Sequence, residues 1–327
     1  MKPKVVLYHP VPSDLSSELE SCFEVTSFDR VTDTNREKFL ESIRDADGLI
    51  GMGLPVPTSA LREATELKVI ATISAGYDAF DVEELTRRNV VLMNLFDPLT
   101  ETTADMAFAL LMATARRIVE LDRKVREGLW QKGPINHWFG LDIHGKTLGI
   151  VGMGRIGSAI AQRGALGCGM KVLYTARTPK PEAEKRFSAR RCELDELLAV
   201  SDFVCLVVPL SDETRGMIGS RELGLMKKTA ILVNIARGPV VDERALAAAL
   251  QEHIIYGAGL DVFEAEPLPA DSPLMSLENV VLAPHIGSAT QETRDAMARY
   301  AAESLIGYLC RGESRNVVNP SALLASR

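Results

Sequence analysis

Short apolar runs rich in β-branched residues alternate with amphipathic helical stretches along the whole chain. In the first third, strands are predicted near 4–8, 23–28, 47–51, 67–72 and 90–93, and helical stretches near 13–21, 35–45, 58–65 and 81–88. Strands that alternate with helices in this way indicate βα units and a parallel sheet. The chain is therefore expected to be an α/β protein.

The remaining two thirds of the chain repeat this pattern after a long helical segment. One helix is predicted from about Glu101 to Gly128, and an irregular arm from Trp130 to Lys146. A second series of strands follows, near 147–151, 171–175, 203–207, 230–234, 256–260 and 279–282. Asp242 is expected to cap a helix over 243–251, and a last helix is expected over 291–311. Two α/β units are predicted.

Length, charge and cysteine content narrow the class of protein. The 327 residues suffice for two domains, and the net charge of -7 gives no broad positive surface for nucleic acid or an anionic membrane. The five cysteines are far apart, with no CxxC pair, so neither a disulfide framework nor a metal site is expected. With no signal peptide or membrane span in the sequence, a soluble protein of the cytoplasm is expected.

A glycine-rich turn stands between the strand near 147–151 and the next helix. The residues are Gly152-Met153-Gly154-Arg155-Ile156-Gly157, the GxGxxG pattern. Gly152 would permit the tight turn, Gly154 would let a pyrophosphate approach the backbone, and Gly157 would allow close helix–strand packing. Because the helix N-terminus presents free amides to phosphates, dinucleotide binding is predicted here, with Arg155 and Ile156 in the same turn.

The end of the following strand bears on which dinucleotide is used. An NAD enzyme generally places Asp or Glu there to accept from the ribose 2′-hydroxyl. This chain reads Tyr174-Thr175-Ala176-Arg177-Thr178, without a carboxylate. Arg177 could bind a 2′-phosphate through its guanidinium, and Thr178 could add a hydroxyl. NADPH is therefore the expected cofactor, with NADH as the weaker alternative.

Three candidate catalytic groups each follow a predicted strand in the second half of the chain. They are Arg237, a carboxylate at Glu264 or Glu266, and His285. Carboxyl ends of strands in an open parallel sheet are where ligands bind. Reduction of a ketone needs a cation for the substrate and an acid for the developing alkoxide, and these side chains can supply both.

Taken jointly, the motifs GMGRIG, NIARGPVVDE, GLDVFEAEP and PHIGSAT, with ISAGYD over 73–78, resemble the D-isomer-specific 2-hydroxyacid dehydrogenases. Within that family, the chain is most similar to reductases of glyoxylate, hydroxypyruvate and 2-ketogluconate. The resemblance covers nearly the whole chain and also implies NADPH. It implies two doubly wound parallel sheets, a Rossmann cofactor domain over 99–286 inserted into a flavodoxin-like substrate domain of 1–98 plus 287–327. The active site would lie in the cleft between the domains.

The resemblance also implies roles for matching residues. His285 would donate the proton, Glu266 would favour its imidazolium form, and Arg237 would bind the substrate carboxylate and carbonyl oxygen. The backbone amides of Ala75 and Gly76 would bind the same carboxylate. Leu54 could shape the substrate pocket, and Trp138 could either reach the substrate pocket of a partner subunit or merely anchor the arm. The residues implied in binding cofactor are Asp261, which would face the nicotinamide amide, and Pro209, Ile235 and Gly287.

The function expected on this basis is NADPH-dependent reduction of a small 2-oxo acid to the D-2-hydroxy acid. The segment 115–130 fits the dimer-forming helix of the family and implies a homodimer. Two alternatives stay open. One is an NAD-linked dehydrogenase of the D-lactate or phosphoglycerate type, against which the missing acidic residue at Ala176 argues. The other is a nucleotide-sensing binding protein that resembles the corepressors of this family.

Overall fold

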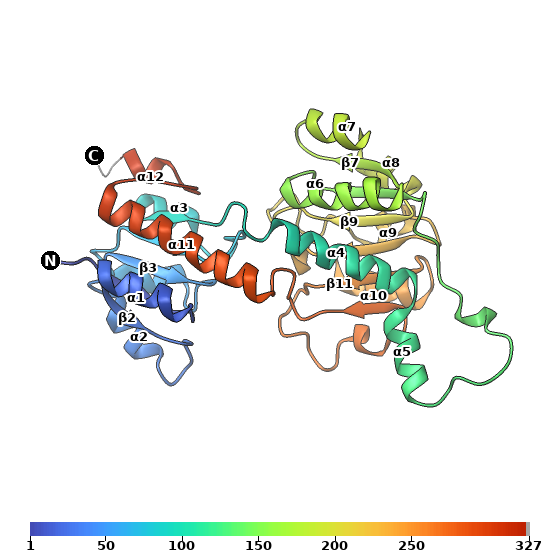
Figure 1. Ribbon diagram of the computed structural model, residues 1–327, viewed down its shortest axis with the longest axis horizontal. Coiled ribbons are helices and arrows are strands. Elements are labelled where there is room, and N and C mark those ends of the chain that lie inside the picture. Colours follow the sequence, from blue (N-terminus) through green and yellow to red (C-terminus); the bar gives the residue numbers. More distant parts are fainter. Residues whose placement is uncertain (325–327) are drawn as a thin grey trace. The chain divides into compact units, whose positions relative to one another are not determined.

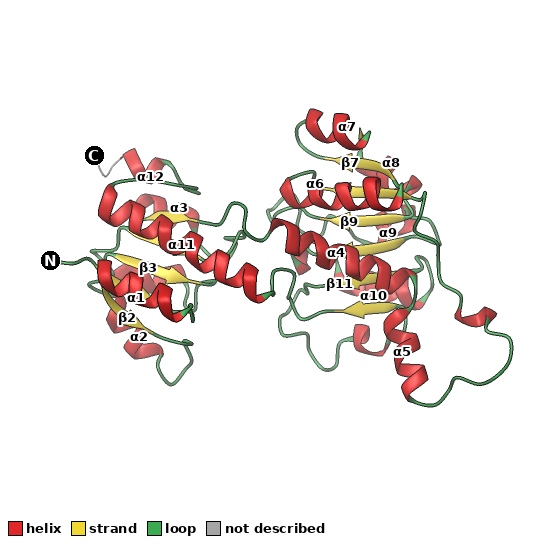
Figure 2. Ribbon diagram, in the orientation of Figure 1, coloured by secondary structure: helices red, strands yellow, loops and turns green. Residues whose placement is uncertain are grey.

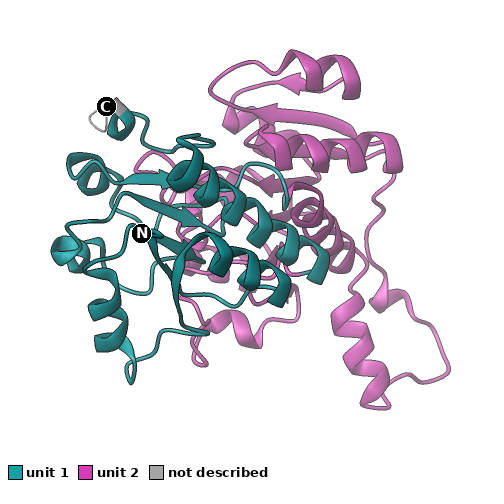
Figure 3. Ribbon diagram, turned by 60° about the vertical axis from the view of Figure 1, so that its left-hand side comes forward, with its two compact units in different colours: residues 1–99, 290–327 teal, residues 100–289 magenta. Residues whose placement is uncertain are grey.

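The computed structural model describes residues 1–324, which fold into two compact units. The first unit contains Met1–Leu99 and the C-terminal segment from Thr290, and the second contains Thr100–Ala289 (Figure 3). The second unit is thus inserted into the sequence of the first. Each unit is an α/β fold built on its own parallel sheet.

The first unit contains a five-stranded parallel sheet in the order β2-β1-β3-β4-β5. Its strands are β1 (Lys4–Leu7), β2 (Glu24–Ser27), β3 (Gly48–Gly51), β4 (Val69–Thr72) and β5 (Val91–Met93), and its helices are α1 (Ser13–Cys22), α2 (Arg36–Ile43), α3 (Val82–Arg87), α11 (Gln291–Arg311) and α12 (Ser321–Leu324). Helix α11 packs on β3 and β4 with α1 beside it (Figure 1). On the other face, Phe39, Leu61 and Leu85 pack against the sheet. This strand order is the flavodoxin-like one.

The second unit contains a seven-stranded parallel sheet in the order β12-β11-β10-β9-β6-β7-β8 (Figure 2). The strands are β6 (Thr147–Val151), β7 (Lys171–Thr175), β8 (Arg190–Arg191), β9 (Phe203–Leu206), β10 (Ile231–Asn234), β11 (Gly257–Leu260) and β12 (Val280–Leu282). The helices are α4 (Thr100–Ala115), α5 (Ile118–Arg126), α6 (Arg155–Gln162), α7 (Pro181–Phe187), α8 (Leu194–Val200), α9 (Ser220–Leu225) and α10 (Glu243–Gln251). Because the chain winds outward from β6 in both directions, this is the Rossmann order with one more strand.

Two apolar layers sandwich the second sheet. Helices α4 and α6 pack on one face, where Leu110, Leu111 and Ile160 are buried. Helices α8, α9 and α10 bury their leucines on the other face. The strands are buried on both faces, which explains why they read as continuous apolar runs rather than as an alternating pattern.

The helix expected from Glu101 to Gly128 is two helices, α4 and α5, so that prediction was wrong. Arg117 interrupts it with a φ of 54°, in the left-handed region. Its guanidinium donates to Glu120 and to the carbonyl oxygen of His137, and Leu141 donates its amide to the carbonyl oxygen of Ala115. These contacts with the returning arm stabilise the break, and a helical pattern in the sequence cannot reveal them.

Other helices are as expected, with one difference in type. Asp242 caps α10 by accepting from the amide of Ala245 at 2.9 Å, and α11 spans Gln291–Arg311. The stretch expected to be helical over 58–65 is a short 3-10 helix, Thr58–Glu63, which follows Pro57. Over residues 1–324, no helix combines the length and apolarity that crossing a membrane would require.

Candidate active site

The side chains of His285 and Glu266 are in hydrogen-bond contact at the carboxyl ends of β12 and β11. The Nδ1 atom of His285 lies 2.7 Å from Oε2 of Glu266, and the two side chains are 47% and 36% exposed. Strands β12, β11 and β10 are neighbours in the sheet, so the segments carrying His285, Glu266 and Arg237 leave it at the same edge. The imidazole is oriented by a carboxylate and still reaches solvent, as an acid that acts on a small ligand must.

The two candidate carboxylates of this segment have different partners. The second oxygen of Glu266 accepts from the amide of Phe263 at 3.0 Å, which fixes the carboxylate that faces His285. Glu264 instead accepts from the amide of Glu243, and its own amide donates to the Glu243 carboxylate. Glu264 is thereby tied to the start of α10, so Glu266 is the partner of His285.

Asp261 holds the segment that follows His285. Its side chain is buried, and its two carboxylate oxygens accept from the amides of Ile286 at 2.8 Å and Gly287 at 2.7 Å. Burial raises the pKa of the Asp261 carboxyl, and the two backbone hydrogen bonds oppose that rise. His285 has a φ of 54°, so these bonds fix an unusual turn at the proposed acid.

Arg237 leaves β10 through a turn that Asn234 organises. The buried Asn234 side chain accepts from the amide of Ala236 at 3.0 Å and donates to the carbonyl oxygen of Arg237 at 3.1 Å. At the next residue, a Cβ built on Gly238 would lie 1.8 Å from the carbonyl carbon of Phe263. The backbone that carries Arg237 is therefore packed directly against the backbone that carries Glu266.

Beside these two side chains is a cavity of about 470 Å³, lined by His285, Glu266 and mainly apolar residues such as Phe263, Met275 and Leu282.

The three glycines of the GxGxxG turn occupy different environments. Gly152 has a φ of 105°, and a Cβ there would lie 2.7 Å from the carbonyl oxygen of Val207. A Cβ on Gly157 would lie 2.3 Å from the carbonyl oxygen of Gly152, whereas no atom lies within 4 Å of one built on Gly154. The turn is thus tight at its ends and open at Gly154, where α6 begins, so a diphosphate could approach the backbone there.

A guanidinium and a hydroxyl group follow the end of β7. Arg177 and Thr178 are exposed after the strand, and Arg191 donates to the carbonyl oxygen of Ala176 at 2.9 Å, which fixes the loop. The segment 174–178 has no carboxylate that would repel a 2′-phosphate. The other residues implied in cofactor binding lie at carboxyl ends of strands of the same sheet: Arg155 and Ile156 after β6, Pro209 after β9, Ile235 after β10 and Gly287 after β12.

In the first unit, Ala75 and Gly76 lie in a loop after β4. Its carbonyl groups are engaged: Ser74 accepts from the amide of Leu95, Ala75 from the side chain of Asn94, and Gly76 from the hydroxyl of Ser74. Within residues 1–324, the amides of Ala75 and Gly76 donate to no protein acceptor. They are suited to bind an anion. Leu54 is half-buried after β3, at the same edge of this sheet.

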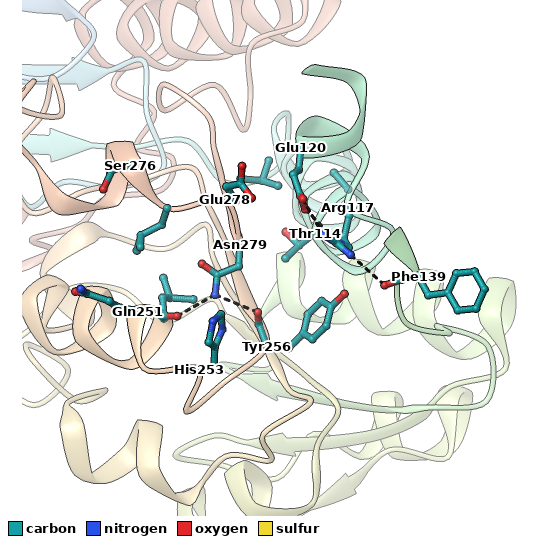
Figure 4. Close-up of a pocket in the computed structure, with 14 residues that line it drawn as sticks. Thr114, Arg117, Glu120, Phe139, Gln251, His253, Tyr256, Ser276, Glu278 and Asn279 are labelled. Atoms are coloured by element: carbon teal, nitrogen blue, oxygen red, sulfur yellow. Dashed lines mark hydrogen bonds and ion pairs between the residues drawn. The ribbon is translucent and has the colours of Figure 1, made fainter. Parts of the chain in front are cut away.

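Trp138 lies in the arm, in a short 3-10 helix over Asn136–Trp138, with its ring edge-on to His137. Arg117 anchors this segment: it forms two hydrogen bonds with Glu120 and donates to the carbonyl oxygen of His137 at 2.6 Å. Figure 4 shows Arg117 with its bonds to Glu120 and to the carbonyl oxygen of Phe139, beside a cavity of about 390 Å³ that Tyr256 and Asn279 also line. None of the residues expected to be catalytic lines that cavity.

The structure thus brings together Glu266 and His285 in side-chain contact, with Arg237 at the same sheet edge. Sequence reasoning missed the supporting roles of Asn234 and Gly238, and it did not foresee that Asp261 holds the His285 segment. The motif NIARG contains both missed residues, but their role depends on a contact with a segment that is remote in the sequence.

Comparisons with known proteins show which family the chain belongs to. The family model for the D-isomer specific 2-hydroxyacid dehydrogenase NAD binding domain matches residues 108–287. Glyoxylate/hydroxypyruvate reductase B of Yersinia pestis (strain Pestoides F) is 52% identical over 324 residues, 99% of each chain. An NADPH-dependent glyoxylate/hydroxypyruvate reductase from Sinorhizobium meliloti, solved with NADP and malonate, is 31% identical with a TM-score of 0.83 over 98% of each chain. A glyoxylate reductase from Paecilomyes thermophila is 30% identical, with a TM-score of 0.84 over 97% of this chain and 98% of that one.

The motifs over 73–78 and 152–290, the two parallel sheets and the paired His285 and Glu266 therefore have one explanation: the chain belongs to the D-isomer specific 2-hydroxyacid dehydrogenase family.

Proposed function

We propose that the protein is an NADPH-dependent reductase that converts glyoxylate, hydroxypyruvate and related 2-oxo acids into D-2-hydroxy acids. The observation that carries this proposal is the His285–Glu266 pair, 2.7 Å apart, at the same sheet edge as Arg237 and the GxGxxG turn. The 52% identical relative is named for both substrates, and the Sinorhizobium meliloti relative was solved with NADP. We assign cofactor binding to the second unit and substrate binding to the first.

The proposed chemistry follows from the orientation of His285. Because Nδ1 faces Glu266, Nε2 is the ring nitrogen that can donate a proton to the substrate. Arg237 would bind the substrate carboxylate and polarise the carbonyl oxygen, which becomes the hydroxyl oxygen when it takes this proton. A bound nicotinamide would supply the hydride that reduces C2. The Glu266 carboxylate would stabilise the imidazolium before the proton leaves.

The proposal also assigns binding roles in the first unit and the arm. The amides of Ala75 and Gly76 would bind the substrate carboxylate, and Leu54 would contact the substrate. Trp138 would contact substrate from a second copy of the chain. In support of a homodimer, apolar side chains of α5 and the arm are exposed, among them Val119 at 52%, Trp130 at 68% and Phe139 at 63%. The five free cysteines suit the reducing cytosol, the compartment that we propose.

The test is the initial rate of nicotinamide oxidation with NADPH and NADH separately, each with glyoxylate, hydroxypyruvate, 2-ketogluconate and pyruvate. We expect rapid oxidation of NADPH with glyoxylate and hydroxypyruvate. A preference for NADH would contradict the role proposed for Arg177 and favour the NAD-linked alternative. Tight dinucleotide binding without turnover of any substrate would favour the nucleotide-sensing alternative.

Replacing Arg177 tests the cofactor assignment separately. In Arg177→Ala, we expect kcat/KM for NADPH to fall about 10- to 100-fold, the range for losing hydrogen bonds between charged groups. The value for NADH is expected to stay within about threefold, because NADH lacks the 2′-phosphate. Arg190→Ala is the matched control, since Arg190 pairs with Glu196. Equal losses for both cofactors would show that Arg177 does not bind the 2′-phosphate.

A further inference from the structure

The loop after β4 presents two adjacent backbone amides, those of Ala75 and Gly76, whose direction is set by hydrogen bonds to the carbonyl groups beside them. The carbonyl oxygen of Ser74 accepts from the amide of Leu95 at 3.0 Å, and that of Ala75 accepts from Nδ2 of Asn94 at 2.7 Å. Both donors belong to the segment 94–95, which follows β5. Two successive carbonyl groups of the loop therefore point towards the same segment.

The direction of these carbonyl groups fixes the direction of the amides. In a trans peptide unit the C=O and N–H groups point in opposite directions, and the units that join Ser74 to Ala75 and Ala75 to Gly76 are both trans. The amides of Ala75 and Gly76 therefore both point away from the segment 94–95. Within residues 1–324 they donate to no protein acceptor. Successive amides that point to one side form a concavity that binds anions.

A chain of two hydroxyl groups restrains the same loop from the side of β4. The Ser74 hydroxyl donates to the carbonyl oxygen of Gly76 at 2.6 Å, and Oγ1 of the fully buried Thr72 lies 2.8 Å from Oγ of Ser74. Because a hydroxyl has one proton and that of Ser74 is given to Gly76, Thr72 is the donor in the second bond. The loop is thus tied to the last residue of β4 as well as to the segment 94–95.

Asn94 is itself held by the C-terminal segment of the chain. Its backbone amide donates to the carbonyl oxygen of Asn316 at 3.3 Å, and the residues after Asn316 pair antiparallel with the end of β5. The buried Asn319 side chain fixes that pairing by accepting from the amide of Leu92 at 2.8 Å. The segment that carries Asn94 is therefore paired backbone on both sides, and it is a rigid support for the loop after β4.

We propose that Asn94 is a positioning residue of the substrate site: it holds the carbonyl group of Ala75 so that the amides of Ala75 and Gly76 face the substrate carboxylate. Without this bond the peptide unit could rotate, and the Ala75 carbonyl oxygen would then face the carboxylate and repel it. Ser74 supplies the second restraint. This inference rests on the proposed function, because it assumes that these two amides bind the carboxylate. Asn94 and Ser74 take no part in hydride or proton transfer.

The test separates substrate binding from turnover. In Asn94→Leu, which has a side chain of similar size without a donor, KM for glyoxylate and the inhibition constant of oxalate are each expected to rise about 10- to 100-fold, the range for losing hydrogen bonds to a charged group. The kcat and the dissociation constant of NADPH are expected to stay within about threefold, because the amides contact the carboxylate equally before and during the reaction. In Ser74→Ala, KM and the inhibition constant are expected to rise about 3- to 10-fold, the range for one neutral hydrogen bond.

Asn35→Leu and Ser42→Ala are the matched controls, because each removes a bond of the same chemical type in the same unit. Asn35 donates its side-chain amide to the carbonyl oxygen of Arg30, and Ser42 donates its hydroxyl to that of Lys38. Both controls are expected to keep the wild-type KM. Should Asn94→Leu fail to fold, Asn94→Asp decides the result, since aspartate keeps the shape of the side chain but repels the Ala75 carbonyl oxygen instead of donating to it.

The outcomes distinguish this inference from the function on which it rests. Wild-type protein that reduces glyoxylate, together with an Asn94 variant whose KM and oxalate inhibition constant are unchanged, would overturn the inference and leave the proposed function standing. A loss of kcat or of NADPH affinity as large as the rise in KM would also overturn it, because that pattern marks a general structural role for Asn94. If the wild type reduces no 2-oxo acid at all, the proposed function fails, and this inference fails with it.

Discussion

Replacing His285 with Gln is expected to lower kcat for glyoxylate reduction by about 10²–10⁴-fold, the range for losing a positioned general acid. Glutamine keeps a polar group of similar reach but has no proton that it can give to an alkoxide at neutral pH. The Glu266 carboxylate, which now lies 2.7 Å from the imidazole, would have no cation to stabilise. Because the cofactor is assigned to other residues, NADPH binding is expected to persist.

The measurement is steady-state kcat together with the dissociation constant of NADPH, obtained from quenching of protein fluorescence. His144→Gln serves as the control, since His144 is an exposed histidine of the same unit, outside the site. Turnover within about threefold of the wild type in His285→Gln would refute the assignment of the acid, which predicts a far larger loss. If the variant lost both NADPH binding and turnover, the substitution would instead have disrupted the turn that Asp261 holds.

Much of the fold follows from local patterns in the sequence. Strands such as β4 and β10 are short apolar runs buried on both faces, so their positions could be predicted closely. Strand β8 could not, because it contains only Arg190 and Arg191 and pairs with β7 at the edge of the sheet. Its strand conformation depends on the neighbouring strand rather than on an apolar pattern.

The break between α4 and α5 shows a second limit. The residues around it favour a helix, and the sequence there contains neither Gly nor Pro. Arg117 nevertheless adopts a left-handed conformation, because its side chain links Glu120 to the carbonyl oxygen of His137 in the arm. Tertiary contacts of this kind override local propensity.

The candidate site was predictable to a similar degree. The motifs place His285, Glu266 and Arg237 after neighbouring strands, which is why a resemblance in sequence could indicate all three. Asn234 and Gly238 were missed because their importance lies in contacts: Asn234 bonds the backbone of its own turn, and Gly238 packs against Phe263. Such positions are recognised only when the two segments are seen together.

Gly238→Ala is expected to cause a large loss of activity although Gly238 has no side chain to take part in the reaction. A Cβ at this position would lie 1.8 Å from the carbonyl carbon of Phe263 and 2.3 Å from the amide nitrogen of Glu264. Both neighbours are backbone atoms, so the methyl group can be accommodated only if one of the two segments moves. One segment carries Arg237 and the other carries Glu266, so any such shift misplaces a side chain to which we assign a catalytic role.

We expect kcat/KM of Gly238→Ala to fall by about 10²-fold or more, the effect of a displacement of about 1 Å at a reacting group. Overpacking is also expected to lower the free energy of unfolding by about 1–3 kcal/mol. The control for kcat/KM and for the free energy of unfolding is Gly224→Ala. Gly224 lies in α9 with no atom within 4 Å of an added Cβ, and alanine there favours the helix. If Gly238→Ala matched this control in activity and in urea unfolding, the two backbone segments would not be rigidly packed. The alignment of Arg237 with Glu266 would then have to come from the ligand instead of from the fold.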